Sequence, residues 1–153
     1  DLQMSNQITD QLKLEWVDKE TIFRECDVIS LHVPLTSETK NLVGEAELRI
    51  MKKDALLINL ARGGIVDELA LYQALIENRI GGAAIDVFEN EPYSGPLTKL
   101  PNCILTAHMG SMSTDCRVKM EIDATEDAVR FIRQQALLRP LPASEYLIQT
   151  SIC

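Results

Sequence analysis

The feature that most limits what this chain can fold into is the alternation of short apolar runs with segments of helical periodicity. Each run is five or six residues long. The run at 55–59 is apolar on both faces, as a strand buried in a parallel sheet should be. Strands are therefore predicted at 28–33, 55–59, 83–88 and 103–107.

Helical segments follow three of the four runs. Asp67 is suited to be an N-cap, with Glu68 in the first turn and Leu71 and Leu75 forming an i,i+4 pair. Helices are predicted at about 45–51, 67–78 and 113–135. The last helix carries four apolar residues on one face: Val118, Ile122, Val129 and Ile132. This order of elements predicts an α/β fold with a parallel sheet built from βαβ units.

Composition narrows the class of partner. The chain has 153 residues, 46% of them hydrophobic, which is enough for one domain with a core. A net charge of −8 argues against binding to nucleic acid and to an anionic membrane surface. We find no apolar stretch long enough to span a bilayer and no signal-peptide pattern at the N-terminus.

The four cysteines lack the spacing of a metal site. None are at CxxC spacing, and none cluster with His32 or His108 at metal-ligand distances along the sequence. We therefore expect no bound metal, reduced thiols and a cytoplasmic location.

Chemically active side chains follow the predicted strands. Arg62 follows the second strand, Asp86 lies in the third with Glu91 just beyond it, and His108 follows the fourth. In open parallel sheets, ligands bind beyond the carboxyl ends of the strands. Each residue also has a purely structural explanation, such as a surface ion pair or a turn cap, but their convergence on one edge favours a site.

These side chains suit one kind of chemistry. Arg62 offers a planar fork to a carboxylate, and His108 can exchange a proton near neutral pH. A carboxylate such as Glu91 would orient the imidazole. The residues describe a site that binds a small carboxylic acid and exchanges one proton with it. If the accompanying step is hydride transfer, a nicotinamide cofactor must supply it.

Four motifs, in this order and spacing, resemble the NAD-dependent D-2-hydroxyacid dehydrogenases, nearest to the phosphoglycerate dehydrogenase type. They are "CDVISLHVPLTSETKNLV", "MKKDALLINLARGGIVDELALYQAL", "GGAAIDVFENEP" and "ILTAHMGSMS". The likeness covers about 26–131. One departure is Ala107, where the family usually has proline before the histidine.

The resemblance implies catalytic roles for three residues. Arg62 matches the arginine that binds the substrate carboxylate and carbonyl, and His108 matches the histidine that takes the hydroxyl proton during oxidation. Glu91 matches the glutamate that pairs with this histidine.

The resemblance also implies NAD as the cofactor. Asp86 matches the residue that holds the nicotinamide carboxamide, and Gly110 matches the turn beside the nicotinamide. Val33 and Leu60 match positions that contact the cofactor largely through the backbone. Asp1 falls about where the family places the acidic residue that binds the adenosine ribose. NAD is favoured over NADP only if Asp1 has that role.

The phosphate-binding motif of a dinucleotide fold does not occur in this sequence. None of the seven glycines have GxGxxG spacing, and the matching family segment would precede residue 1. We therefore expect a partial doubly wound parallel sheet, Rossmann-like, forming the second half of an NAD-binding domain. Residues 1–135 would be the C-terminal part of that domain, and 136–153 a segment returning towards a substrate domain outside this sequence.

A partial sheet has consequences for assembly. The strand at 28–33 would have an open edge, and the segment 14–17, expected as a further strand, would lack its neighbour. We expect this polypeptide alone to be inactive. It would form a homodimer or be completed by the rest of a parent chain.

The leading functional hypothesis is an oxidoreductase fragment. Its parent would interconvert a D-2-hydroxyacid and a 2-oxoacid, such as a 3-phosphoglycerate-type substrate, with NAD(H). One alternative is a non-catalytic NAD-binding protein of the corepressor type on the same fold. Another is an inactive truncated product. The sequence does not identify the particular hydroxyacid.

Overall fold

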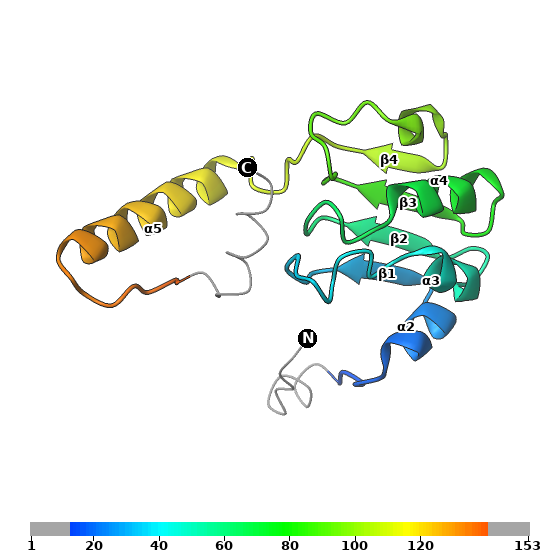
Figure 1. Ribbon diagram of the computed structural model, residues 1–153, viewed down its shortest axis with the longest axis horizontal. Helices are drawn as coiled ribbons and strands as arrows, with labels where there is room; N and C mark the ends of the chain where they lie inside the picture. The colour runs from blue at the N-terminus through cyan, green and yellow to red at the C-terminus, as the bar shows by residue number, and fades with distance from the viewer. Residues whose placement is uncertain (1–12, 141–153) are drawn as a thin grey trace.

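A four-stranded parallel sheet, with its strands side by side in chain order, forms the centre of the structure (Figure 1). The computed structural model describes residues 13–140. The strands are β1 (Val28–Leu31), β2 (Leu56–Asn59), β3 (Gly82–Ile85) and β4 (Cys103–Leu105). The helices are α2 (Lys19–Glu25), α3 (Glu45–Ile50), α4 (Glu68–Ile76), the 3-10 helix η1 (Pro96–Lys99) and α5 (Thr114–Ile132).

The strands end in register. Leu31 pairs with Asn59, Asn59 with Ile85, and Ile85 with Leu105. The segments that follow β2, β3 and β4 therefore all leave the sheet at the same carboxyl edge. This alignment is what allows residues far apart in the sequence to meet there.

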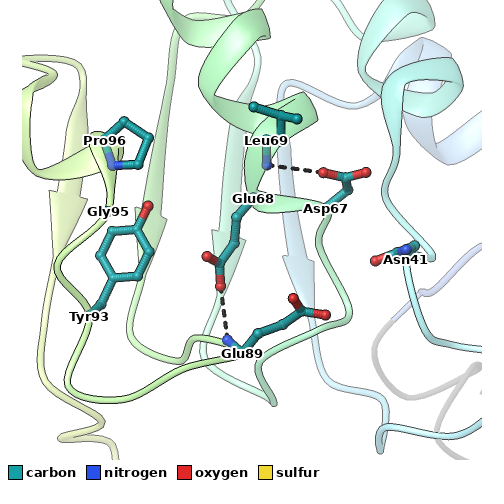
Figure 2. A pocket seen from close by; sticks show the side chains of 8 residues that line it. All are labelled: Asn41, Asp67, Glu68, Leu69, Glu89, Tyr93, Gly95 and Pro96. Atoms are coloured by element: carbon teal, nitrogen blue, oxygen red, sulfur yellow. Dashed lines mark hydrogen bonds between the residues drawn. The ribbon is translucent and has the colours of Figure 1, made fainter.

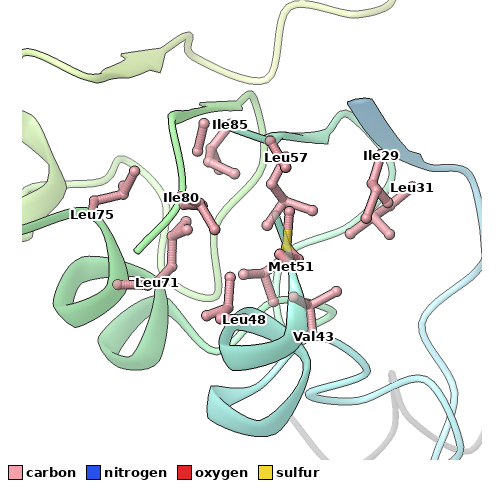
Figure 3. Close-up of a cluster of buried hydrophobic side chains, with 14 of the residues drawn as sticks. Ile29, Leu31, Val43, Leu48, Met51, Leu57, Leu71, Leu75, Ile80 and Ile85 are labelled. Atoms are coloured by element: carbon pink, nitrogen blue, oxygen red, sulfur yellow. The ribbon is translucent and has the colours of Figure 1, made fainter. Parts of the chain in front are cut away.

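One face of the sheet carries the hydrophobic core. Alternate strand residues such as Ile29, Leu57 and Ile85 are buried against side chains of α3 and α4, including Leu48 and Leu71 (Figure 3). The opposite face exposes Val28, Leu56 and Ile104. Within the described residues, the strands are therefore held in place by apolar packing on the face that α3 and α4 cover.

The four strands predicted between residues 28 and 107 and the three predicted helices are confirmed, each somewhat shorter than predicted. Asp67 caps α4 as expected, because its carboxylate accepts hydrogen bonds from the amides of Leu69 and Ala70. Ser113 caps α5. The apolar residues predicted on one face of α5 are exposed, and α5 lies beyond the carboxyl ends of the strands, away from the sheet (Figure 1).

Three local features differ from what the sequence led us to expect. The expected strand at 14–17 is wrong: this segment has no regular secondary structure, and within residues 13–140 β1 pairs with β2 alone. Helix α2 was not predicted, although Asp18 caps it by accepting from the Thr21 amide at 2.8 Å. The short η1 lies in a stretch expected to be loop, where Pro96 occupies the first turn.

Candidate active site

The turn after β2 delivers Arg62 to the carboxyl edge. Asn59 ends the strand, and the Leu60 side chain is 50% exposed just beyond it. The Arg62 guanidinium is exposed, and its Nη1 donates to the Ala61 carbonyl at 2.8 Å. This turn therefore presents a cation to solvent at the edge where ligands bind in parallel sheets.

Gly63 places this turn directly against the segment after β3. A Cβ atom on Gly63 would lie 2.0 Å from the Phe88 carbonyl oxygen, closer than any side chain permits. Gly64, which follows, has a φ of 79°, in the left-handed region that favours glycine. The two glycines allow backbone-to-backbone contact between the Arg62 turn and the segment that carries Glu91.

Glu91 and His108 meet at this edge. Nδ1 of His108 lies 2.9 Å from Oε2 of Glu91. The other carboxylate oxygen of Glu91 accepts from the Phe88 amide at 3.0 Å. That hydrogen bond, followed by the contact with His108, lowers the pKa of Glu91 below its ordinary value although partial burial opposes the change. An ionised carboxylate on Nδ1 leaves Nε2 of the half-exposed imidazole to face a ligand.

Asp86 holds the turn that carries His108. Its carboxylate accepts from the amides of Met109 at 2.8 Å and Gly110 at 3.0 Å, and from the Thr106 hydroxyl. Its carbonyl accepts from the His108 amide at 2.8 Å. The φ of His108 is 54°, a backbone conformation that non-glycine residues rarely adopt. The hydrogen bonds to Asp86 stabilise it.

The charge of Asp86 is stabilised despite its burial. The residue is 2% exposed. Burial would raise the pKa of Asp86, but the hydrogen bonds from Thr106, Met109 and Gly110 outweigh it and lower the pKa. A buried anion therefore lies directly beneath the histidine turn.

A cavity of about 690 Å³ opens beside the histidine. Its wall includes Phe88 and Tyr93, whose rings stack with centroids 4.2 Å apart. His108 and Glu91 supply its polar side, and Met109 and Leu105 add apolar surface.

A second cavity, of about 380 Å³, lies by the N-terminus of α4 (Figure 2). It is lined by Asp67, Glu68 and Glu89, and Glu68 accepts from the Glu89 amide at 2.8 Å. Burial, with repulsion from Glu89 and Asp67, raises the pKa of Glu68. This acidic cavity does not resemble a site for an anionic substrate.

The structure thus joins some of the predicted residues and leaves others apart. Glu91, His108, Asp86 and Gly110 form one hydrogen-bonded unit. Arg62 lies on the neighbouring turn, and within residues 13–140 no hydrogen bond or ion pair joins it to Glu91 or His108.

The other three predicted cofactor contacts are not part of that unit. Val33 is half-buried after β1, and Leu60 is exposed after β2. Asp1 lies outside the described residues.

Sequence reasoning missed the residues that hold these side chains in place. Asn59, Thr106 and the Phe88 amide each bond to a predicted site residue or to its turn. A signal existed for Asn59, because it is the one polar residue in the apolar run 55–59. The Phe88 amide, as a backbone group, leaves no trace in the sequence.

The described part of the chain has neither a metal-binding cluster nor a membrane-spanning helix. No group of three or more His, Cys, Asp or Glu residues there could hold a metal ion. None of the helices there is long and apolar enough to cross a membrane.

Comparisons with known proteins identify the family of the chain. Residues 2–110 match the family described as "D-isomer specific 2-hydroxyacid dehydrogenase, NAD binding domain". Glyoxylate reductase from Aeropyrum pernix is 45% identical over 127 residues, which are 82% of this chain and 38% of that protein. D-3-phosphoglycerate dehydrogenase from Archaeoglobus fulgidus is 37% identical over 85% of this chain and 25% of its own length.

Solved structures show the same fold. The holo form of D-mandelate dehydrogenase from Rhodotorula graminis superposes with a TM-score of 0.85 and 28% identity, covering 94% of this chain and 43% of that one. The chain therefore spans less than half the length of each protein compared here. Its matched segment and its fold lead to one assignment: the chain belongs to the D-isomer specific 2-hydroxyacid dehydrogenase family, and residues 2–110 match the NAD-binding domain of that family.

Proposed function

We propose that the full-length protein interconverts a D-2-hydroxyacid and a 2-oxoacid with NAD(H), and that this chain supplies the proton-transfer and carboxylate-binding side chains. The observation that carries the proposal is the Glu91–His108 pair at the carboxyl edge of the sheet. Relatives of this chain include proteins named for glyoxylate, phosphoglycerate and glycerate, all of which are small acids.

His108 acts as the acid and base. Because Nδ1 faces Glu91, Nε2 is the atom that takes the proton from the substrate hydroxyl during oxidation and returns it during reduction. Glu91 stabilises the imidazolium that forms, since its lowered pKa keeps the carboxylate ionised. The same contact fixes the ring orientation and the tautomer.

Arg62 binds the substrate carboxylate. Its guanidinium makes one hydrogen bond to protein within the described residues, to the Ala61 carbonyl, which leaves several N–H groups for a ligand. A bidentate pair with a carboxylate would orient the carbon that bears the hydroxyl or the carbonyl.

The residues present suit the nicotinamide end of NAD. The bound cofactor would accept or donate the hydride. Asp86 accepts three hydrogen bonds, and a carboxylate has about four lone-pair sites, so about one remains for a carboxamide N–H. Val33, Leu60 and Gly110 would contact the cofactor from the strand ends, and Asp1 would bind its ribose.

The domain limits are part of the same proposal. Residues 1–135 form the C-terminal part of the NAD-binding domain, and 136–153 return towards a substrate domain. The start of that return is tied to α5, because Asp127 accepts from the amides of Leu138 and Arg139.

Two further parts of the proposal concern assembly and location. The outer edge of β1 pairs with a second copy, giving a homodimer, or with more of the parent chain. The free thiols of Cys26, Cys103 and Cys116 support a cytoplasmic location.

The test is a turnover assay on the full-length protein. NADH oxidation is followed with glyoxylate, and NAD reduction with D-lactate, glycerate and 3-phosphoglycerate; simple alcohols and ketones without a carboxylate serve as controls. We expect turnover of at least one acid and of none of the controls. Tight NADH binding without turnover of any acid would contradict the proposal and favour a binding protein.

A further inference from the structure

A buried amide side chain lies beneath the turn that carries Arg62. Asn59 is the last residue of β2, faces the core side of the sheet and is 1% exposed. Burying a carboxamide is unfavourable unless its polar atoms are hydrogen-bonded. The partners of this side chain therefore indicate what it does.

Both polar atoms of the Asn59 side chain bond to the backbone of the turn that follows, at Ala61 and Arg62. Nδ2 donates to the Arg62 carbonyl at 3.0 Å, and Oδ1 accepts from the Ala61 amide at 3.1 Å. The Asn59 carbonyl accepts from the Asp86 amide at 3.0 Å, which anchors this strand end to β3. The turn 60–62 is thus closed onto one fixed side chain.

The chemistry of these contacts requires a carboxamide. The Ala61 amide can only donate and the Arg62 carbonyl can only accept, so the group between them must offer one acceptor and one donor. An ionised aspartate has the same shape but cannot donate to Arg62. A leucine of similar volume satisfies neither partner.

A second contact fixes the far side of the same turn. The Gly63 backbone lies against the Phe88 carbonyl, and the Phe88 amide holds Glu91. The Arg62 backbone is therefore held by Asn59 on one side and by the Glu91 segment on the other. Among the described residues, the one hydrogen bond of the guanidinium is to the Ala61 carbonyl, so its reach is set by where the turn lies.

We propose that Asn59 is the positioning residue for Arg62, setting the place from which the guanidinium binds the substrate carboxylate. This inference rests on the proposed function, since it gives Arg62 that role. Asn59 does not touch the substrate. It acts through the backbone of the turn, and its loss should weaken substrate binding more than it slows the chemical step.

The experiment compares variants of the full-length protein. Asn59→Asp keeps the side-chain shape and removes only the donor. Leu57→Val is the matched control, because Leu57 is buried on the same face of the same strand two residues earlier. For each variant, kcat and KM for the 2-oxoacid, the Kd for NADH and the Tm are measured.

We expect Asn59→Asp to raise the KM for the acid by about 10- to 100-fold, with a smaller fall in kcat. The Kd for NADH should rise by less than the KM for the acid, since of this turn only the Leu60 backbone is proposed to contact the cofactor. Leu57→Val should lower the Tm and leave KM unchanged. In an Arg62→Ala background, adding Asn59→Asp should have almost no further effect on kcat/KM, because the side chain that it positions is gone.

Three results would overturn the inference: an unchanged KM in folded Asn59→Asp, an equal rise in KM in Leu57→Val, or an Asn59 effect that persists in full in the Arg62→Ala background. If Asn59→Asp does not fold, Asn59→Ser replaces it under the same criteria, since a hydroxyl is too short to serve both partners. Failure of the proposed function looks different: Arg62→Ala itself would leave KM for the acid unchanged.

Discussion

Oε2 of Glu91 and Nδ1 of His108 lie 2.9 Å apart although the two residues are 17 positions apart in the sequence. The contact exists because β3 and β4 end in register and each is followed by a short turn at the same edge. The Phe88 amide fixes the second oxygen of Glu91, so the carboxylate cannot rotate without losing a bond. The imidazole is therefore oriented before any ligand arrives.

Replacing Glu91 with glutamine should lower kcat more than it raises KM for the acid. The amide can retain the shape of the contact but cannot stabilise an imidazolium by charge, so we expect kcat to fall by about 10- to 100-fold. Steady-state kinetics of the full-length protein measure this.

Glu89→Gln is the matched control for that substitution. Glu89 lies two residues earlier in the same segment and is exposed, and within residues 13–140 no hydrogen bond or ion pair joins it to His108. It should behave like the wild type. Equal kinetic losses in both variants would argue that the segment, and not the Glu91 carboxylate, is what matters.

Replacing Asp86 with asparagine should destabilise the fold in a pH-dependent way. One end of the amide would direct N–H groups at the Met109 or Gly110 amide, which are themselves donors. A loss of about 1–3 kcal/mol at neutral pH is expected for such a buried mismatch. Thermal unfolding at several pH values provides the measurement.

The direction of the pH dependence follows from the lowered pKa of Asp86. A carboxyl whose pKa is lower in the folded state stabilises the fold above its unfolded pKa, about 3.9, and this contribution is lost as the pH falls through the folded-state pKa. The Tm gap between wild type and Asp86→Asn should therefore be wide at pH 7 and narrow below about pH 4. A gap that stays constant across this range would contradict the assigned hydrogen bonds.

Gly63→Ala should impair both stability and turnover. The added Cβ would lie 2.0 Å from the Phe88 carbonyl oxygen, so the backbone that holds Glu91 has to move. Gly44→Ala is the comparison, because its Cβ would meet nothing closer than 3.6 Å. Measured by Tm and kcat/KM, the first variant should be strongly affected and the second nearly neutral; similar behaviour of the two would disprove the close contact.

Core and surface truncations should separate the two faces of the sheet. Leu75 in α4 is 1% exposed, and changing it to alanine should lower the free energy of unfolding by about 2–5 kcal/mol. Ile104 in β4 is 69% exposed, and Ile104→Ala should lower the free energy of unfolding by less than about 0.5 kcal/mol if this face of the sheet is open to solvent. Chemical denaturation measures both. A large loss for Ile104→Ala in the full-length protein would mean that another segment or subunit covers this face.

The fold was largely predictable from the sequence because its signals are local. Apolar runs, the N-cap at Asp67 and the cap at Ser113 are each set by a few neighbouring residues. The strand expected at 14–17 failed for the opposite reason. A strand needs a partner, and pairing is not encoded in the segment itself.

The candidate site divides in the same way. Arg62, Asp86 and His108 stand at strand ends, so their common edge could be predicted from topology. Asn59 stands out in the sequence as a polar residue in an apolar run, but its partners in the Arg62 turn follow only from the geometry. The Phe88 amide, which holds the Glu91 carboxylate, leaves no trace in the sequence. The strained φ of His108 also has no signature in the sequence.

The most direct test of the account is the turnover number of His108→Ala in the full-length protein, measured with the best acid substrate and NADH, alongside the Kd for NADH. We predict a fall in kcat of at least about 100-fold with NADH binding intact, because only the proton-transfer group is removed. A kcat within a few-fold of the wild type, in a folded variant that binds NADH normally, would contradict the assignment of His108 as the acid and base.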